Sequence, residues 1–229
     1  MHPTLVGGGS AETTQEGVPV VYRSNYGIAD LHKSAVNNLK RFDVCVTYYP
    51  SSWAAEEGAS IIKRVWGFPG ETLDMSYSPA DPEHDQPYPT YTFSVYKEKD
   101  GKVLYSYEYK APVISIERTY EGEYKIGNVR HFTKVTKTFD YAAKFTVENK
   151  VFYVNAKSSR VFTKTLANNE YFVMGDNWAS STDSFSRISY EDKLTKNYLQ
   201  GKAICIYGYA TAQNGEAKDI HKFKARYYF

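Results

Sequence analysis

The segment Ile61-Ile62-Lys63-Arg64-Val65-Trp66-Gly67-Phe68-Pro69-Gly70-Glu71-Thr72 predicts a strand that carries one lysine and ends in a tight turn. Its first half is rich in β-branched and aromatic residues, which suit a half-buried pleated surface. Glycine and proline follow and favour a turn, because proline presets φ and glycine accepts positive φ. Lys63 lies just before this turn, between apolar neighbours. Burial there would disfavour the charged ammonium and lower the pKa of the lysine toward the range of a general base.

A second unusual segment is Gly175-Asp176-Asn177-Trp178-Ala179-Ser180-Ser181-Thr182-Asp183-Ser184, which follows the apolar run 172–174. We predict a strand that enters a Gly-Asp-Asn turn, because Asp and Asn side chains bond to nearby backbone. A dense set of hydroxyls and a carboxylate comes next. Composition alone favours a structural loop here, just as it favours two solvated charges at the Lys-Arg pair of the first segment.

The composition is that of a folded, β-rich protein. The chain has 229 residues, enough for one large or two small domains with a sizeable core. Its 22 tyrosines, together with many Val, Thr and Phe residues, favour strands. Tyrosine also suits a surface that meets lipid headgroups, although strand composition is the simpler explanation for most of these residues. The net charge of +2 gives no reason to expect nucleic acid as a partner.

Neither the cysteines nor the histidines indicate a metal site. Cys45 and Cys205 each lie in an apolar run without metal-type spacing, and the sequence leaves open whether they are two buried thiols or one disulfide. The five histidines are scattered and form no metal-like pair. We therefore expect no metal and no cofactor. Among these residues we also find no Gly-x-Ser-x-Gly elbow, no signal peptide and no apolar stretch long enough to span a bilayer.

Strand patterns run along most of the chain, and no long segment has a helical period. The predicted strands are 20–23, 43–49, 61–66, 91–96, 103–109, 113–117, 145–147, 151–154, 172–174 and 199–207. Asp-Gly within 99–102 predicts a hairpin, and 31–39 a short helical or irregular turn. We expect a discontinuous core formed by residues 1–74 and 170–212, an inserted and smaller β-rich domain at 75–169, and a polar C-terminal tail at 213–229.

These segments, in this order, resemble the motifs of the type I signal peptidases, membrane-anchored serine proteases that use a Ser-Lys dyad. Met1-His2-Pro3-Thr4-Leu5 matches the motif Ser-Met-x-Pro-Thr-Leu after its serine. Arg41-Phe42-Asp43-Val44-Cys45-Val46 resembles Arg-Gly-Asp-Ile-Val-Val, and residues 63–71 resemble Lys-Arg-Val-Val-Gly-Leu-Pro-Gly-Asp. Residues 175–185 are similar to Gly-Asp-Asn-Arg-x-x-Ser-x-Asp-Ser-Arg, and Gly201-Lys202-Ala203 to the last core motif. The likeness covers residues 1–74 and about 170–208.

The resemblance implies a mostly β fold with a signal-peptidase-like catalytic core and assigns roles to the two segments. Lys63 would be the general base, Ser181 would hydrogen-bond its amine, and Asp183 would support that geometry. Further structural support would come from the other motif residues of the two segments: Arg64, Gly175, Asp176 and Asn177.

The resemblance also implies a substrate and a location. Ile61 and Ile62 would offer a strand edge to an extended peptide, a mode in which backbone bonds bind and pockets select. Met1 and Leu5 would help to form small pockets, which explain the family's preference for small side chains, typically alanine, at the first and third positions before the cut. The partners would be signal peptides of exported preproteins and the membrane surface. The location would be the extracytoplasmic face of the cell membrane, reached by an N-terminal anchor upstream of Met1.

The chain departs from the motifs at three places. The nucleophilic serine would stand directly before Met1, and both oxyanion donors would go with it, so the chain as given is expected to be inactive. A start at an internal methionine, a trimmed chain or a true non-catalytic relative would each explain this. Phe185 stands where the motif has an arginine that pairs with an aspartate, and Arg187 is the candidate substitute. Trp178 replaces the other arginine of the motif.

Two functions therefore remain under consideration. The first is a signal peptidase I whose anchor and serine lie upstream of Met1. The second is a non-catalytic signal-peptidase-like protein that binds exported or pilus proteins, or assists their folding or assembly. The joint presence of Lys63 and Ser181 favours the first, because a binding module has no evident use for a desolvated lysine. The absent serine and the two absent arginines favour the second.

Overall fold

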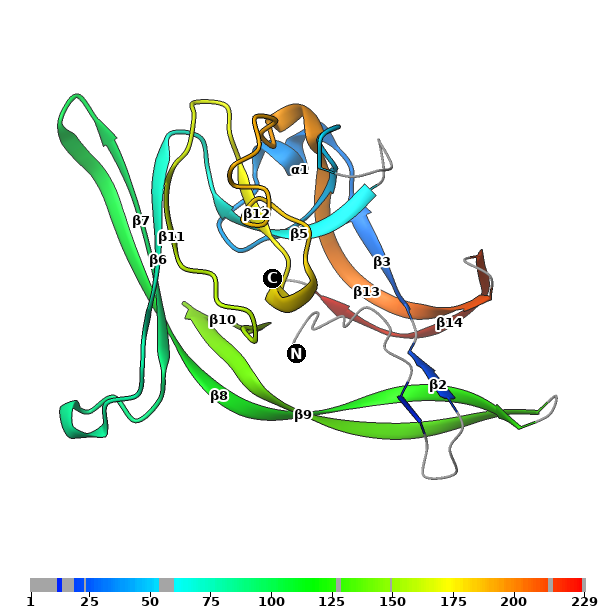
Figure 1. Ribbon diagram of the computed structural model, residues 1–229. Coiled ribbons are helices and arrows are strands. Elements are labelled where there is room, and N and C mark those ends of the chain that lie inside the picture. The colour runs from blue at the N-terminus through cyan, green and yellow to red at the C-terminus, as the bar shows by residue number, and fades with distance from the viewer. Residues whose placement is uncertain are drawn as a thin grey trace.

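The computed structural model describes residues 12–13, 19–22, 24–53, 60–126, 129–148, 150–213 and 216–227. In this part of the chain nearly all regular structure is β, arranged in two antiparallel sheets (Figure 1). This confirms the mostly β fold expected from the sequence.

The first sheet is built mainly from the middle of the chain. Its order is β1-β2-β8-β7-β6-β11, with β9 paired to β8 and β10 to β9. The strands are β1 (Glu12–Thr13), β2 (Pro19–Tyr22), β6 (Glu71–Ser78), β7 (Thr90–Lys99), β8 (Lys102–Ile126), β9 (Val129–Val147), β10 (Lys150–Asn155) and β11 (Phe162–Thr165). The β7–β8 hairpin turns at Asp100 and Gly101, with φ of 53° and 74°, which confirms the Asp-Gly prediction.

The second sheet combines strands from residues 24–67 with strands from residues 172–227. Its order is β12-β5-β4-β13-β14, with β3 paired to β13. The strands are β3 (Ser24–Asp30), β4 (Val44–Tyr48), β5 (Ser60–Gly67), β12 (Phe172–Met174), β13 (Leu199–Gln213) and β14 (Glu216–Tyr227). The helices are short: α1 (Lys33–Asn37) and the 3-10 turns η1 (Pro82–His84), η2 (Trp178–Ser180) and η3 (Lys196–Tyr198). β14 lies in the segment 213–229, for which the sequence indicated only a polar tail.

β5 and the turn after it have the predicted form. Trp66 is fully buried, and Gly70 has a φ of 74°, a conformation that glycine accepts at little cost. The chain then returns through Glu71, whose buried carboxylate accepts bonds from the Arg41 guanidinium at 2.6 and 3.0 Å. The same carboxylate accepts a bond from the backbone N–H of Phe68 at 2.7 Å. A buried charge is stable only when paired in this way, so this ion pair stabilises the turn from β5 into β6.

An aromatic cluster joins the two sheets. Trp66 of β5 lies edge-on to Phe93 of β7 and to Phe145 of β9, with ring centroids 5.1 Å apart in both pairs. Phe152 of β10 stacks on Phe145 with centroids 5.2 Å apart. Edge-to-face and offset contacts at these distances add about 0.5–1.5 kcal/mol per pair beyond the area they bury. This cluster therefore joins the two sheets, and β5 contributes Trp66 to it and Val65 to a second buried cluster.

Phe42 contributes to this cluster from an unusual backbone conformation. Its φ is 65°, in the left-handed region that favours glycine, which is the residue that the Arg-Gly-Asp motif has at this place. Its buried ring lies 5.0 Å from Tyr109 and 5.1 Å from Phe152, centroid to centroid. Left-handed backbone costs a side chain about 1–2 kcal/mol, whereas burying a phenylalanine contributes about 1.5–3 kcal/mol. Packing of the ring offsets the strain.

The strained backbone of Phe42 predicts that a glycine at this position is more stable than an alanine, the reverse of the usual order. Both Phe42→Ala and Phe42→Gly remove the ring, and we expect losses of about 3–5 kcal/mol in the free energy of unfolding. Because glycine escapes the left-handed penalty, Phe42→Gly should be the less destabilised of the two by about 1 kcal/mol. Urea unfolding followed by circular dichroism measures the difference. An alanine variant more stable than the glycine variant would refute the strain that we assign to Phe42.

Candidate active site

Pairing between β5 and β12 brings the two unusual segments together. Val173 lies opposite Val65, and Met174 lies opposite Arg64. The loop that follows β12 therefore begins at Gly175, next to the part of β5 that carries Lys63. A Cβ atom placed on Gly175 would lie 3.7 Å from Lys63 Nζ.

Lys63 is half-buried on β5, opposite Cys45 of β4. Burial lowers the pKa of its amine below the ordinary lysine value, and the guanidinium of Arg160 lowers that pKa further. The carboxylates of Asp183 and Asp176 act in the opposite direction, and so, more weakly, does Cys45. The net effect of these influences is a Lys63 pKa below the ordinary lysine value. A larger fraction of Lys63 is therefore neutral near pH 7 than of an exposed lysine, which is the form that a general base requires.

Ser181 lies near the same face of Gly175 as Lys63. A Cβ on Gly175 would collide with Ser181 Oγ and lie 2.9 Å from Ser181 Cβ, so only glycine leaves room for this serine. The Ser181 hydroxyl is buried and has no hydrogen-bond partner among the described residues. The expected bond to the Lys63 amine is thus not formed in this structure, although both groups lie close to Gly175.

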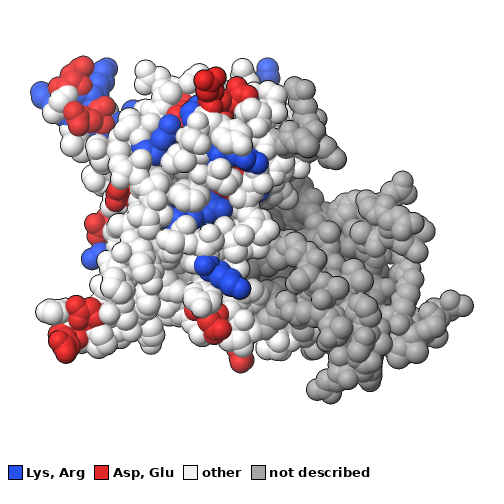
Figure 2. Space-filling view, viewed as in Figure 1, with Lys and Arg blue, Asp and Glu red and all other residues white. Residues whose placement is uncertain are grey.

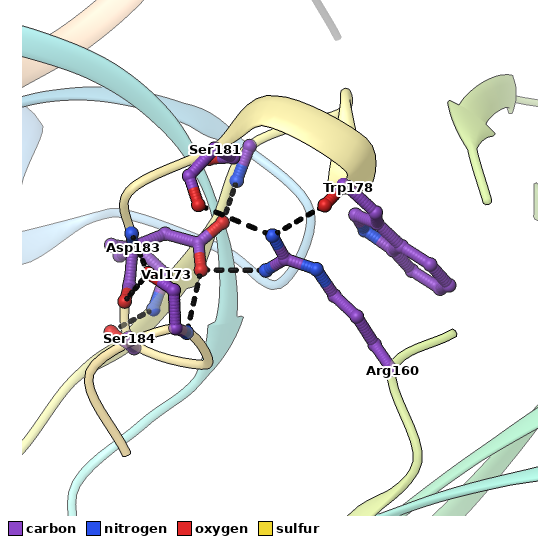
Figure 3. Close-up of polar contacts among 8 residues, drawn as sticks. Arg160, Val173, Trp178, Ser181, Asp183 and Ser184 are labelled. Atoms are coloured by element: carbon purple, nitrogen blue, oxygen red, sulfur yellow. Dashed lines mark hydrogen bonds and ion pairs between the residues drawn. The ribbon is translucent and has the colours of Figure 1, made fainter. Parts of the chain in front are cut away.

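Asp183 holds the loop in place. Its carboxylate is fully buried and accepts a bond from the Gly175 backbone N–H at 2.9 Å. It also accepts a bond from Arg160 Nη1 at 2.6 Å and one from the Ser186 backbone N–H at 3.2 Å (Figure 3). The next residue, Ser184, accepts a bond from the Val173 N–H at 3.0 Å and returns one to the Val173 carbonyl at 3.0 Å. The loop is therefore fastened to β12.

Arg64 and Asp176 form a second buried pair beside Lys63. The Arg64 guanidinium donates to both carboxylate oxygens of Asp176, at 2.8 and 2.5 Å. Asn177 accepts a side-chain bond from Asn155 at 3.1 Å, and the Asn155 N–H donates to the Asp176 carbonyl at 2.7 Å. Two parallel charge-assisted bonds fix direction as well as distance, so the turn 175–177 has one orientation relative to β5.

The start of β5 offers an open strand edge. β4 pairs with β5 along Ser60–Arg64, whereas β12 pairs with β5 only from Arg64 onward. Within the described part of the chain, no strand pairs with Ile61 or Ile62 on the β12 side. Ile61 is half-buried and Ile62 is 55% exposed. The other two predicted substrate-binding residues, Met1 and Leu5, lie outside the described residues.

A pocket adjoins the Ser181 loop. Its volume is about 390 Å³, and hydroxyl groups and two aromatic rings make up much of its wall. Its lining residues are Ser158, Arg160, Trp178, Ala179, Ser180, Ser181, Thr182, Phe185 and Ser186. It is open enough to admit a small group next to the loop.

The cation that replaces the missing motif arginine comes from a different residue than the candidate that the sequence offered. Arg187, the expected substitute for the missing motif arginine, instead binds the Tyr190 hydroxyl at 2.6 Å and lies 4.7 Å from the centre of that ring. The cation that pairs with Asp183 is Arg160, which no motif singled out. Trp178, in place of the second arginine, is buried in the aromatic core, 5.1 Å from the Tyr91 ring.

The close approach of Gly175 and Ser181 gives a testable coupling. Gly175→Ala should lower the free energy of unfolding by about 1–3 kcal/mol, because its methyl group collides with the Ser181 side chain. Adding Ser181→Gly removes that side chain and should recover most of the loss. Thermal or urea unfolding of both single variants and the double variant gives the coupling energy. Simple additivity of the two changes would contradict the packing described here.

In the part of the chain that the structure describes, no helix is both long and apolar enough to cross a bilayer.

Comparison with known proteins agrees with the motifs. No curated protein sequence matches the chain significantly. The family model described as signal peptidase, peptidase S26, matches residues 1–208. This match confirms the resemblance to type I signal peptidases, and at the level of the family it carries serine peptidase activity. Because the match takes in most of the 229 residues, the chain belongs to the signal peptidase family, peptidase S26.

Proposed function

We propose that this protein is a signal peptidase I-type serine endopeptidase that uses a Ser-Lys dyad, with Lys63 as its general base. The observation that carries the proposal is the position of Lys63. Its side chain is half-buried on β5, immediately after an open strand edge, and both its amine and the buried Ser181 hydroxyl lie close to Gly175. Family membership supports the reaction type.

The chemistry requires Lys63 to be neutral when the reaction begins. Its amine takes the proton from the nucleophilic serine, whose oxygen attacks the scissile carbonyl. The resulting ammonium gives that proton to the leaving amine, and an acyl-enzyme ester remains. Water then attacks the ester with Lys63 again as base, which releases the carboxylate and restores the serine. We place this serine directly before Met1, as in the motif Ser-Met-x-Pro-Thr-Leu.

The substrate in this proposal is an extended signal peptide of an exported preprotein. Its backbone would pair with the open edge at Ile61 and Ile62, and the cut would fall next to Lys63. Met1 and Leu5 would help to form the small pockets. The enzyme would act at the extracytoplasmic face of the membrane, held by an N-terminal anchor. Figure 2 shows both basic and acidic side chains on the described part of one face.

One alternative has an observation in its favour. In a non-catalytic member that binds exported or pilus proteins, or assists their assembly, Lys63 and Ser181 would not need to interact. Their hydrogen bond is not formed in this structure, since Ser181 Oγ has no partner among the described residues. A cleavage assay separates the two functions.

A test of Lys63 as general base uses a chain with a serine directly before Met1 and an N-terminal membrane anchor. Such a chain should cleave a signal-peptide substrate, and Lys63→Ala should lower kcat by about 10²–10⁴-fold, the usual contribution of a general base. The neutral amine is the active form, so kcat/KM should rise with pH. Because the pKa of Lys63 is lowered, the rise should be complete below the ordinary lysine pKa of about 10.4.

Lys99→Ala, at the exposed tip of the β7–β8 hairpin, is the matched control and should cleave normally. Absence of cleavage at every pH from about 7 to 10, a range that brackets a lowered lysine pKa, would overturn the catalytic proposal in favour of a binding protein.

A further prediction distinguishes an effect of Ser181 on catalysis from an effect on the stability of the fold. Ser181→Ala removes a buried hydroxyl that has no partner, so it should leave the free energy of unfolding nearly unchanged while lowering kcat. Ser184→Ala is the matched control. It removes the acceptor of the Val173 N–H and should cost about 1–3 kcal/mol of stability. Circular dichroism beside the cleavage assay makes the comparison, and loss of the fold in Ser181→Ala would refute its catalytic assignment.

A further inference from the structure

Arg160 is a buried cation that comes from outside both motif segments. It lies in the connection between β10 and β11 and is only 2% exposed, although its neighbours Ser159 and Val161 are exposed. Its Nη1 donates to Asp183 Oδ1 at 2.6 Å. Burying a guanidinium is costly; both Nη groups of Arg160 find acceptors, whereas its Nε has no hydrogen-bond partner among the described residues.

The same guanidinium bonds to the backbone of the Ser181 loop at two further places. Arg160 Nη2 donates to the Trp178 carbonyl at 3.0 Å and to the Ser181 carbonyl at 3.3 Å (Figure 3). Together with the Asp183 carboxylate, these acceptors span the whole turn that presents Ser181. Asp183 in turn bonds to the Gly175 N–H. Arg160 therefore holds both ends of the short segment in which the serine lies.

Arg160 also occupies the space next to the missing motif arginine. Phe185 stands at the motif position, and the centre of its ring lies 4.9 Å from the Arg160 guanidinium carbon. In the motif, the arginine at this position pairs with an aspartate, and Asp183 is the carboxylate that Arg160 binds here. The phenylalanine instead places its ring against the Arg160 guanidinium, a favourable cation–π contact.

We propose that Arg160 is the positioning residue of this site, and that it supplies to Asp183 and to the Ser181 loop the cation that residue 185 does not provide. The connection between β10 and β11 is thereby an integral part of the site. The effect on cleavage rests on the function proposed above, whereas the effect on the loop and on Lys63 does not.

The charges around Lys63 give the inference a direct readout. Asp183, Arg160, Asp176 and Cys45 all influence its amine. Arg160 disfavours the ammonium, and Asp183 favours it. Removing the guanidinium alone leaves an unpaired carboxylate beside Lys63, so the Lys63 pKa should rise. Placing a guanidinium at 185 should lower that pKa again.

The experiment compares full-length Arg160→Met with the double variant Arg160→Met/Phe185→Arg. Arg187→Met, which removes the arginine bound to Tyr190, is the matched control. An NMR titration of the Lys63 side chain, assigned with Lys63→Ala, should give a raised pKa in Arg160→Met, a return toward the original value in the double variant, and no change in Arg187→Met.

In the serine-bearing chain, kcat of Arg160→Met should fall by about 10²-fold with little change in KM, because misplacement by about 1 Å has that effect and the substrate edge is intact. The double variant should recover much of the loss.

Two outcomes would overturn the inference. One is an unchanged Lys63 pKa in a folded Arg160→Met protein. The other is a double variant in which Phe185→Arg restores neither the pKa nor kcat. If Arg160→Met does not fold, Arg160→Met/Asp183→Asn removes both charges of the pair, and Arg160→Lys keeps the cation. The role is supported if the pH profile of cleavage is altered in Arg160→Met/Asp183→Asn and partly recovers in Arg160→Lys. Normal pH profiles in both variants refute the role. If the parent protein does not cleave, the proposed function fails while the titration still decides the role of Arg160.

Discussion

The buried ion pair between Arg64 and Asp176 is the interaction on which the site depends most. Two parallel bonds join the two side chains, and a third runs from Arg64 Nη1 to the Phe42 carbonyl at 2.8 Å. The guanidinium also lies 4.2 Å from the centre of the Phe152 ring. One side chain thus ties β5 to the loop after β12, to the left-handed turn at Phe42 and to β10. Breaking such a pair by removing one partner typically costs about 3–5 kcal/mol, because a charge remains buried without compensation.

Two further arginines, the part-buried Arg41 and the buried Arg160, pair with buried carboxylates near the aromatic core. Arg41 binds Glu71 where β5 turns into β6, and Arg160 binds Asp183 where the loop presents Ser181. Each carboxylate also accepts a backbone N–H, so its charge is well compensated. The apolar cluster supplies the driving force for packing, but it is not directional. The ion pairs add direction, since a guanidinium binds a carboxylate only in a few geometries.

The arginine–carboxylate pairs also affect the protonation of Lys63. Its amine lies in the same buried region but has no close carboxylate partner of the kind that the arginines have among the described residues. The carboxylates near it are already engaged by guanidinium groups. Their charge is therefore partly neutralised, which leaves burial as the dominant influence and keeps the pKa of the lysine low. The arginines thus serve the electrostatics of the site as well as its shape.

The sequence by itself determined the β character, the lysine strand with its glycine-proline turn, the hairpin at Asp100 and the family, because these depend on local propensity and short motifs. Only the tertiary structure decided which groups meet. Arg160 lies 23 residues before Asp183 and in no motif, so its pairing could not be predicted from spacing. The glycine of the motif indicates left-handed backbone at position 42, but only the tertiary structure shows why a phenylalanine accepts it, because rings from other strands surround its side chain. Local patterns reflect the preferences of single residues, whereas burial, pKa shifts and long-range ion pairs arise when distant strands pack together.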